Sequence, residues 1–563
     1  MGMATVTISA TMMQFSGYRF WFAAKRRQQT VNNGGRSGMC ATGCPAASGK
    51  TGAVLATVAT ALISTCGHAQ LLPAEVPTAV RPLTAWRFTP EISVTETYTD
   101  NAALVPAPTA LHSWVTETTP GIRIEKRGIR SNLFLDYRLH DFRYARDSRL
   151  NNSQRLLTSR ATVEAVDNWM FVDASANITQ QNRSAFNLVA ATDSTGPNGN
   201  RVETATKQIS PYIRGRLADL ALYQLRFVGA DIRSDDVALP DTKAKQWNGF
   251  IKNQHATAGF GWSIDGNALS FRNKVVGKLH DERIRALVSF EINPQLHVSA
   301  IAGQELTNFA GVQNQRATTS GLGLEWSPSI LTQFAAVKEK RFFGDSHSIS
   351  LSHRTAFTAW KISSNRDLNA LSGQLNASGT GSTASLLADL LASAIPDPAA
   401  REAAVRQKLE SSGIPAGSAL SGGFATGRSY LLRSDEASII LLGANNTVAL
   451  TLSRRDQKGL GTVAAATDSF SLSNDIRQQG VNLSWSHRLS TYASLSLIAT
   501  LLRNEGLSVT TLNTSQRALN VLFSTRVGVH TYMSIGARRV QVDNSLNTSY
   551  RENAVLGSVS VRY

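Results

Sequence analysis

From Trp86 to the C-terminus, apolar and polar residues alternate along a series of stretches of about ten residues each. Successive side chains of a β-strand point to opposite faces of a sheet, so each stretch predicts a strand with one apolar and one polar face. Clear examples are Ala286 to Ile292, Leu495 to Leu501 and Leu519 to Val527. The pattern predicts an all-β chain.

The connections between these stretches are alternately short and long. The short ones are 126–130, 167–169, 218–220, 263–267, 293–294, 327–330, 444–447 and 489–491. The longer ones include 102–112, 184–201, 459–468 and 544–551. This alternation is typical of a transmembrane β-barrel, which has tight turns at one end and longer loops at the other.

The C-terminus of the chain is an alternating strand without a tail. One face carries Val555, Gly557, Val559, Val561 and Tyr563. The other carries Ser558, Ser560 and Arg562, with Leu556 as an apolar exception. An exposed strand of this kind invites aggregation in a soluble domain. In a barrel the last strand pairs with the first and closes the sheet.

Alternation alone also fits a soluble β-sandwich, so the aromatic residues are needed to decide. No window reaches the roughly 18 consecutive apolar residues of a transmembrane helix. Most tryptophans after residue 85 lie in or near the short turns, where a barrel places its interfacial ring. The predicted interface aromatics are Trp86, Trp169, Trp262, Trp326, Trp360, Trp485 and Tyr563. We predict a large antiparallel transmembrane β-barrel over residues 86–563, with about 22 strands (range about 16–24).

The N-terminal region resembles an export signal. Residues 1–70 contain six basic residues and no acidic one, and Lys50 is followed by the apolar run 53–63 and a small-residue stretch. We predict a leader over residues 1–69 cut after Ala69, and a short periplasmic segment over 70–85. Alternatives are a start near Met39 and, less favoured, a lipoprotein cut before Cys66. The pair Arg26-Arg27 lacks the flanking residues of a twin-arginine signal.

Composition agrees with export. Cys40, Cys44 and Cys66 all lie in the predicted leader, so no disulfide, thiol nucleophile or cysteine metal site is expected after cleavage. Removing the six basic leader residues lowers the formal net charge from +17 to about +11. The remaining basic residues are spread over alternating strands, which argues against a nucleic-acid partner.

One segment breaks the strand pattern. Residues 367–428 are rich in Gly, Ser and Ala, and 384–394 and 399–409 predict two short helices separated by Pro396 and Pro398. The segment is either a plug in the lumen or a lightly structured surface loop.

The sequence offers no catalytic, cofactor or metal site. Gly49-Lys50-Thr51 resembles the end of a phosphate loop, but Cys44 stands where the first glycine is needed. His-Glu-x-x-His and Gly-x-Ser-x-Gly motifs are absent from the sequence, and histidines are scattered along strands. We expect no enzyme, although a catalytic site at an outer rim is an alternative.

Several sequence runs together resemble the outer-membrane β-barrel proteins associated with PEP-CTERM/exosortase systems. They are 89–101, Trp326-Ser327-Pro328, Lys340 to Gly344, Ser350 to Arg354, Thr358-Ala359-Trp360 and Trp485 to Leu489. The resemblance covers nearly all of residues 86–563. It implies a barrel in the outer membrane of Gram-negative bacteria that export exopolysaccharide, and it supplies no ligand or catalytic residues.

By alternation, a set of arginines should point into the lumen: Arg123, Arg138, Arg214, Arg216, Arg226, Arg526, Arg538 and Arg562. A positively lined channel attracts anionic solutes, including acidic polysaccharide. Tyr212 and Tyr532 would be available to stack on sugar rings. Alternatively, the arginines pair with inward acids such as Asp136, Glu125 and Glu291.

We therefore expect a channel or accessory for exopolysaccharide export. The alternatives are a non-conducting docking barrel of the export or sorting machinery, and an outer-membrane enzyme. Expected partners are outer-membrane lipid, the barrel-assembly machinery through the C-terminal strand, anionic polysaccharide and periplasmic export components.

Overall fold

A computed structural model of the chain describes residues 86–187, 200–236, 239–254, 259–274, 277–309, 314–369, 387–388, 390–391, 395, 398–412, 423–460, 468–508, 512–546 and 548–563. The predicted leader and the segment 70–85 lie outside these residues.

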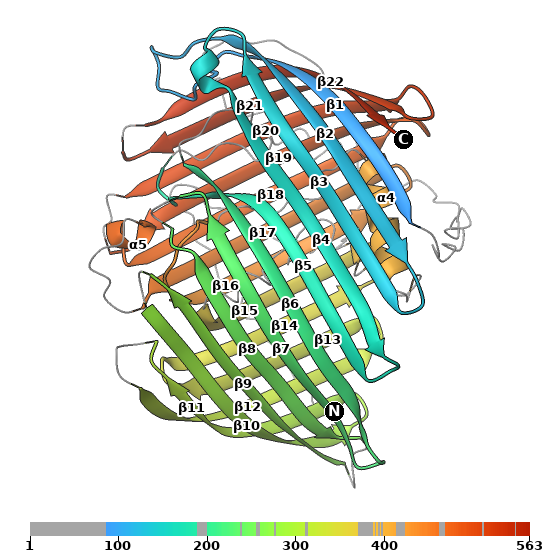
Figure 1. Cartoon of the computed structure of the whole chain (residues 1–563), viewed down its shortest axis with the longest axis vertical. Coiled ribbons are helices and arrows are strands. Elements are labelled where there is room, and N and C mark those ends of the chain that lie inside the picture. The colour runs from blue at the N-terminus through green and yellow to red at the C-terminus, as the bar shows by residue number, and fades with distance from the viewer. Residues whose placement is uncertain are drawn as a thin grey trace, which may run out of the picture. The chain divides into compact units, whose positions relative to one another are not determined.

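The alternating stretches form 22 antiparallel strands (Figure 1). They are β1 (Arg87–Thr99), β2 (Ser113–Arg127), β3 (Ser131–Tyr144), β4 (Asn152–Val166), β5 (Met170–Asn182), β6 (Arg201–Leu217), β7 (Ala221–Ser234), β8 (Thr242–Asn253), β9 (Phe260–Asn273), β10 (Gly277–Asn293), β11 (Leu296–Thr307), β12 (Gln315–Ser329), β13 (Thr332–Arg341), β14 (Gly344–Arg354), β15 (Thr358–Asn369), β16 (Tyr430–Leu442), β17 (Asn446–Gly459), β18 (Asp475–Arg488), β19 (Ala493–Gly506), β20 (Asn513–Arg526), β21 (Thr531–Asn544) and β22 (Tyr550–Arg562).

Each strand pairs with its sequence neighbour, and β22 pairs with β1 to close the sheet. The closing register places Val559 opposite Val94 and Arg562 opposite Glu91. The predicted fold class, a closed antiparallel barrel of about 22 strands with a short helical insertion, is confirmed.

The helices are few and short. The helices whose bounds the structure describes are the 3-10 helix η1 (Ser148–Leu150), α4 (Pro398–Ser412) and α5 (Ser469–Leu472), and residues 387–388 and 390–391 are also helical. In the described part of the chain, no helix is both long enough and apolar enough to cross a bilayer.

The outer wall of the barrel is apolar at mid-strand. Large hydrophobic side chains on the face turned away from the lumen are between about 40% and 70% exposed, among them Val94, Ile284, Val288, Leu322, Leu519 and Val559. Such a surface is stable against lipid and would be costly in water. The described tryptophans of the predicted ring, Trp86, Trp169, Trp262, Trp326, Trp360 and Trp485, lie with Tyr563 at or near strand ends joined by short turns.

We call the end of the barrel with those turns the short-turn end and the opposite end the long-loop end. One predicted turn was wrong. Residues 263–267 lie inside β9, and the true connection is 254–259. The Asp265-Gly266-Asn267 run has turn composition, but its polar residues are used on the lumen face. Asp265 accepts from Arg285, and Asn267 accepts from Gln246.

Candidate functional site: the lumen and the segments inside it

The inward face of the first strands carries a connected network of charges. Asp136 on β3 accepts hydrogen bonds from Arg123 at 3.0 Å and from Arg138 at 3.1 Å. Arg138 lies 3.9 Å from Glu91, which also pairs with Arg562 at 3.2 Å. The network therefore ties β22, β1, β2 and β3 together across the closing seam.

A second inward group stacks aromatic rings and guanidinium groups. Phe171 and Tyr212 are stacked at 5.1 Å, and Arg226 lies 3.9 Å over the Tyr212 ring. Arg214 lies 4.4 Å over Phe171, and Arg226 also bonds to Asp173 at 2.8 Å. Tyr212, expected to stack on sugars, is thus already engaged by protein groups.

The remaining predicted lumen arginines have varied surroundings. Arg538 is buried in a 2.7 Å ion pair with Glu552. Arg526 donates to the carbonyls of Gly528 and Val529 in its own turn. Its guanidinium and that of Arg562 each lie 5.9 Å from the Tyr532 ring. Arg216 is exposed and lies opposite Leu222, next to the β6–β7 turn.

Five of the eight predicted arginines therefore pair with carboxylates: Arg123, Arg138, Arg226, Arg538 and Arg562. For Asp136, this is the pairing of inward arginines with inward acids that the sequence predicts as the alternative. The other named acids behave differently. Glu125 pairs with Arg406 of α4, and Glu291 lies 3.8 Å from His297. Arg214, Arg216 and Arg526, which have no carboxylate partner among the described residues, all lie near the short-turn end.

A buried charge cluster near the long-loop end was missed from the sequence. Arg341 on β13, only 3% exposed, bonds to the fully buried Glu305 and to Asp367. Asp281 lies 3.8 Å from the same guanidinium. Alternation alone would have placed Arg341 on the polar face, but its partners come from β10, β11 and β15 and depend on register.

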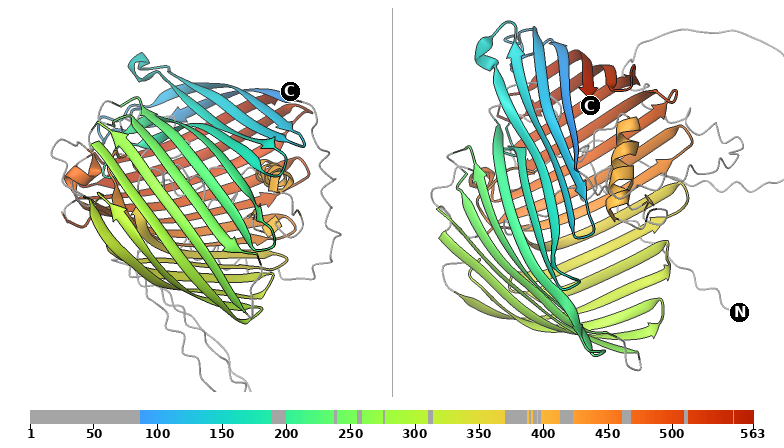
Figure 2. Two further views of the ribbon diagram at one scale, coloured as in Figure 1. Left: turned by 60° about the horizontal axis from the view of Figure 1, so that its bottom comes forward. Right: turned by 45° about the vertical axis from the view of Figure 1, so that its right-hand side comes forward.

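The described part of the insertion lies in the lumen. Leu387, Leu390, Val405 and Leu409 form a buried cluster with inward side chains of β15, β16 and β17, namely Ala359, Ile440 and Ala449. These strand residues lie near the short-turn end. Figure 2 shows α4 along the inner side of these strands. Of the two earlier interpretations of the insertion, these residues support the plug.

The sequence of α4 explains both the helix and its attachment. It starts at Pro398, which suits a first helical turn, and continues with the strong helix formers Ala, Arg, Glu, Gln, Lys and Leu. Val405 and Leu409 lie one turn apart and form an apolar stripe. Glu402 and Arg406 form the neighbouring charged stripe, with an ion pair of 3.2 Å.

The charged stripe of α4 reaches a different part of the wall. Glu402 pairs with Arg160 of β4 at 2.7 Å, and Arg406 pairs with Glu125 of β2 at 3.2 Å. The Arg406 guanidinium also lies 4.7 Å over Phe134 of β3. Burial lowers the pKa of Arg406, and burial followed by the nearby Arg488 lowers the pKa of Lys408. The helix therefore joins two separate parts of the lumen wall.

At the long-loop end, three other segments pack against the inner wall of the barrel: 183–187, 423–429 and 468–474. We call them the mouth segments. Phe186 is fully buried among Phe424, Tyr430, Phe470 and Ile476. Its carbonyl accepts from Thr514 of β20 at 2.9 Å and from Asn544 of β21. The Ala185 carbonyl accepts from Asn504 of β19 at 2.6 Å.

The second mouth segment is fixed in the same manner. Ala425 donates its N–H to the carbonyl of Asn182, and Asn273 of β9 donates to the carbonyl of Gly427 at 2.9 Å. Thr426 donates to Asp468 at 2.7 Å. The described residues 423–429 of the insertion thus lie at the mouth, and its helix α4 lies near the opposite end.

Within the described residues, no group of three or more His, Cys, Asp or Glu side chains is placed to hold a metal ion. A closed antiparallel barrel with an apolar outer wall, a polar inner wall and segments inside it is the architecture of outer-membrane β-barrels. The fold and the site define the chain as a large barrel of this class.

No protein-family model and no curated protein matches the chain. Among solved structures, the FrpB iron transporter from Neisseria meningitidis (F5-1 variant) is 8% identical, with a TM-score of 0.45, over 84% of this chain and 82% of that one. The siderophore receptor PirA from Pseudomonas aeruginosa is 10% identical, with a TM-score of 0.36, over 85% and 80%. The outer membrane protein opdK from Pseudomonas aeruginosa is 7% identical, with a TM-score of 0.31, over 85% and 99%. We draw nothing about substrate or partner from similarities this low.

Proposed function

We propose that the chain is a gated outer-membrane channel whose lumen is closed by α4, and that it serves exopolysaccharide export linked to a PEP-CTERM/exosortase system. The observation that carries the gate is the attachment of α4 to two separate parts of the wall by the ion pairs of Glu402 and Arg406 and by the cluster around Leu409. The family resemblance noted in the sequence supplies the link to export.

The positions of the unpaired charges support an anionic substrate. Most inward arginines are neutralised by carboxylates, whereas Arg214, Arg216 and Arg526 lie towards the short-turn end. In the usual orientation of bacterial barrels, that end faces the periplasm. A polyanion leaving the periplasm would meet this positive charge first.

The test is ion selectivity of the refolded chain lacking residues 387–412, measured as reversal potential across a salt gradient in planar bilayers. The proposal predicts preference for anions and block by an acidic polysaccharide added on the short-turn side. Replacing Arg214, Arg216 and Arg526 by Gln should reduce both effects. Cation preference, or block that does not depend on these arginines, would contradict the substrate class.

A specific observation favours a second candidate, a non-conducting docking barrel. Both ends of the lumen contain packed segments, and those at the mouth are held to the wall by hydrogen bonds that are buried at Ala185 and Phe186 and partly buried at Gly427. If deletion of residues 387–412 leaves the barrel silent, the docking function is the better account.

A further inference from the structure

The outward face of strands β13 to β16 carries a row of basic side chains at one level. Lys338 on β13 lies opposite His347 on β14, His347 lies opposite Arg366 on β15, and Arg366 lies opposite Arg433 on β16. We call these four residues the basic row. Side chains at paired positions point to the same face, and Lys338 is also opposite the outward Leu322, which is 70% exposed. The basic row therefore faces away from the lumen.

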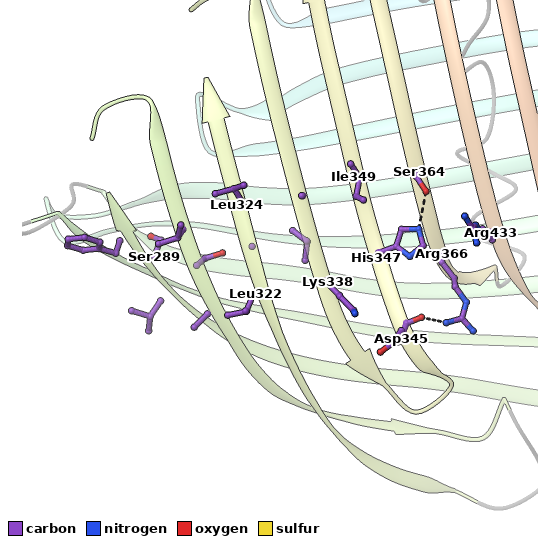
Figure 3. A pocket seen from close by; sticks show the side chains of 18 residues that line it. Ser289, Leu322, Leu324, Lys338, Asp345, His347, Ile349, Ser364, Arg366 and Arg433 are labelled. Atoms are coloured by element: carbon purple, nitrogen blue, oxygen red, sulfur yellow. Dashed lines mark hydrogen bonds between the residues drawn. The ribbon is translucent and has the colours of Figure 1, made fainter. Parts of the chain in front are cut away.

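A groove adjoins the basic row on the same outer wall. Its volume is about 1110 Å³, and its apolar lining includes Val288, Leu322, Leu324, Ala336 and Ile349. Figure 3 shows Leu322 and Leu324 on one side and Lys338, His347, Arg366 and Arg433 on the other. Val288 and Leu322 belong to the exposed apolar wall. In a membrane this half of the groove faces acyl chains.

The charges of the groove do not cancel. Asp435 accepts from Arg433 at 3.1 Å and from Ser364 at 2.6 Å, and Ser364 in turn bonds to His347 at 3.0 Å. Arg366 donates to the backbone carbonyl of Asp345. Among the described residues, no carboxylate lies within 4.0 Å of the Lys338 ammonium group.

The permanent cations at this level are Lys338, Lys340, Arg366 and Arg433, against the carboxylates of Asp345, Asp435 and Asp456. Asp456 lies opposite Arg433 and already pairs with Arg454 and Arg477. The site is thus net positive. Moreover, Arg366 and Arg433 are direct cross-strand neighbours, and like charges in that position destabilise a sheet. Of the two, only Arg433 has a carboxylate partner among the described residues.

We propose that this groove binds a phosphate-bearing membrane lipid, with the headgroup phosphate on the basic row and an acyl chain against Val288, Leu322 and Ile349. The depth is suitable, because each residue of the basic row lies three positions from the long-loop end of its strand, and an outward Arg or Lys is tolerated near the bilayer interface. Arg and Lys are the side chains that bind phosphate best. A second copy of the chain is a poor occupant, since a symmetric contact would bring the two basic rows together.

Native mass spectrometry of the refolded chain tests the proposal. The full chain in detergent is titrated with phosphatidylglycerol or with phosphatidylcholine of the same acyl chains, and one-to-one adducts are counted. The test variant is K338Q/R366Q/R433Q. The matched control is R517Q/R539Q/R551Q, which removes the same charge from the outer wall of β20, β21 and β22. Heat-dependent migration on gels confirms that each variant folds.

The expected result is preferential binding of phosphatidylglycerol, weakened about tenfold in the test variant and by less than about twofold in the control. A third variant, L322W, fills the groove while keeping the charges and should also weaken binding. Equal losses of phosphatidylglycerol binding in the test and control variants would contradict the proposed site, because they would show only a general attraction of the lipid to a basic barrel. Unchanged binding in the test variant, complete displacement by inorganic phosphate, or a dimer in place of lipid adducts would overturn it as well.

Discussion

The segments inside the two ends of the lumen are held to the wall in different ways. At the long-loop end, the mouth segments are held by buried hydrogen bonds from strand side chains to their backbone, as at Phe186 and Gly427. At the short-turn end, the described contacts of α4 with the wall are made by side chains. They are the buried cluster around Leu409, the Arg406–Glu125 pair, and the Arg160–Glu402 pair, whose side chains are 59% and 42% exposed. Breaking buried backbone bonds costs more than releasing a half-exposed ion pair. We infer that the mouth segments are structural and that α4 is the part that moves, as the proposed gate requires.

The largest effect is expected from Arg341→Ala at the long-loop end. The substitution leaves the buried Glu305 and Asp281 without their counter-ion, which typically costs about 3–5 kcal/mol. Urea unfolding from lipid vesicles should show this loss. The exposed loop variant Arg149→Ala is the control and should change stability little. A loss below about 1 kcal/mol for Arg341→Ala would show that the cluster does not stabilise the barrel.

Phe186→Ala tests the mouth segments more locally. The ring is fully buried, and removal of a buried Phe side chain costs about 3–5 kcal/mol, reduced here by relaxation of a loop. In the same unfolding assay, the loss in the free energy of unfolding should be smaller for Phe186→Ala than for Arg341→Ala. We expect no steady current from this variant, because the backbone bonds of the segment and α4 remain. A steady open pore would mean that the mouth is the gate.

At the opposite end, Leu409→Asp tests the attachment of α4. Leu409 is buried against the wall. A carboxylate at this position is costly unless it reaches water, which would detach α4 from the wall. We expect bursts of current in planar bilayers with little change in the unfolding of the strands. Gln407 of α4 is exposed, so Gln407→Asp adds the same charge as a control and should stay closed. If Leu409→Asp instead lowered the stability of the barrel without giving current, α4 would be a structural element and not the gate.

The smallest effect is expected from Arg160→Ala. A half-exposed ion pair contributes about 0.2–1 kcal/mol, so the open fraction should rise by no more than about fivefold. The effect should shrink at high salt, because screening weakens the pair in the wild type. If Arg160→Ala and Glu402→Ala together open the channel no more than either alone, the pair itself is responsible.

The wall of the barrel could be predicted from the sequence, and much of its interior could not. Alternation and turn spacing predict 22 strands and a closing strand over residues 552–563 because these are local properties of the chain. Phe186 lies in a connection that looks like an ordinary loop. It is buried by residues more than 200 positions away, such as Phe424 and Phe470, and its carbonyl is bonded by Thr514 and Asn544. The position of α4 likewise depends on contacts with β2, β4 and β15 to β17 that no local pattern encodes.

The central claim is that α4 closes an otherwise open lumen. The most direct test is single-channel conductance in planar bilayers of the refolded chain with and without residues 387–412, with 423–429 retained so that the mouth keeps its contacts. The account predicts a closed full-length barrel and a deletion variant with current at least about tenfold higher. Equal current in both, or silence in both with correctly folded barrels, would contradict it.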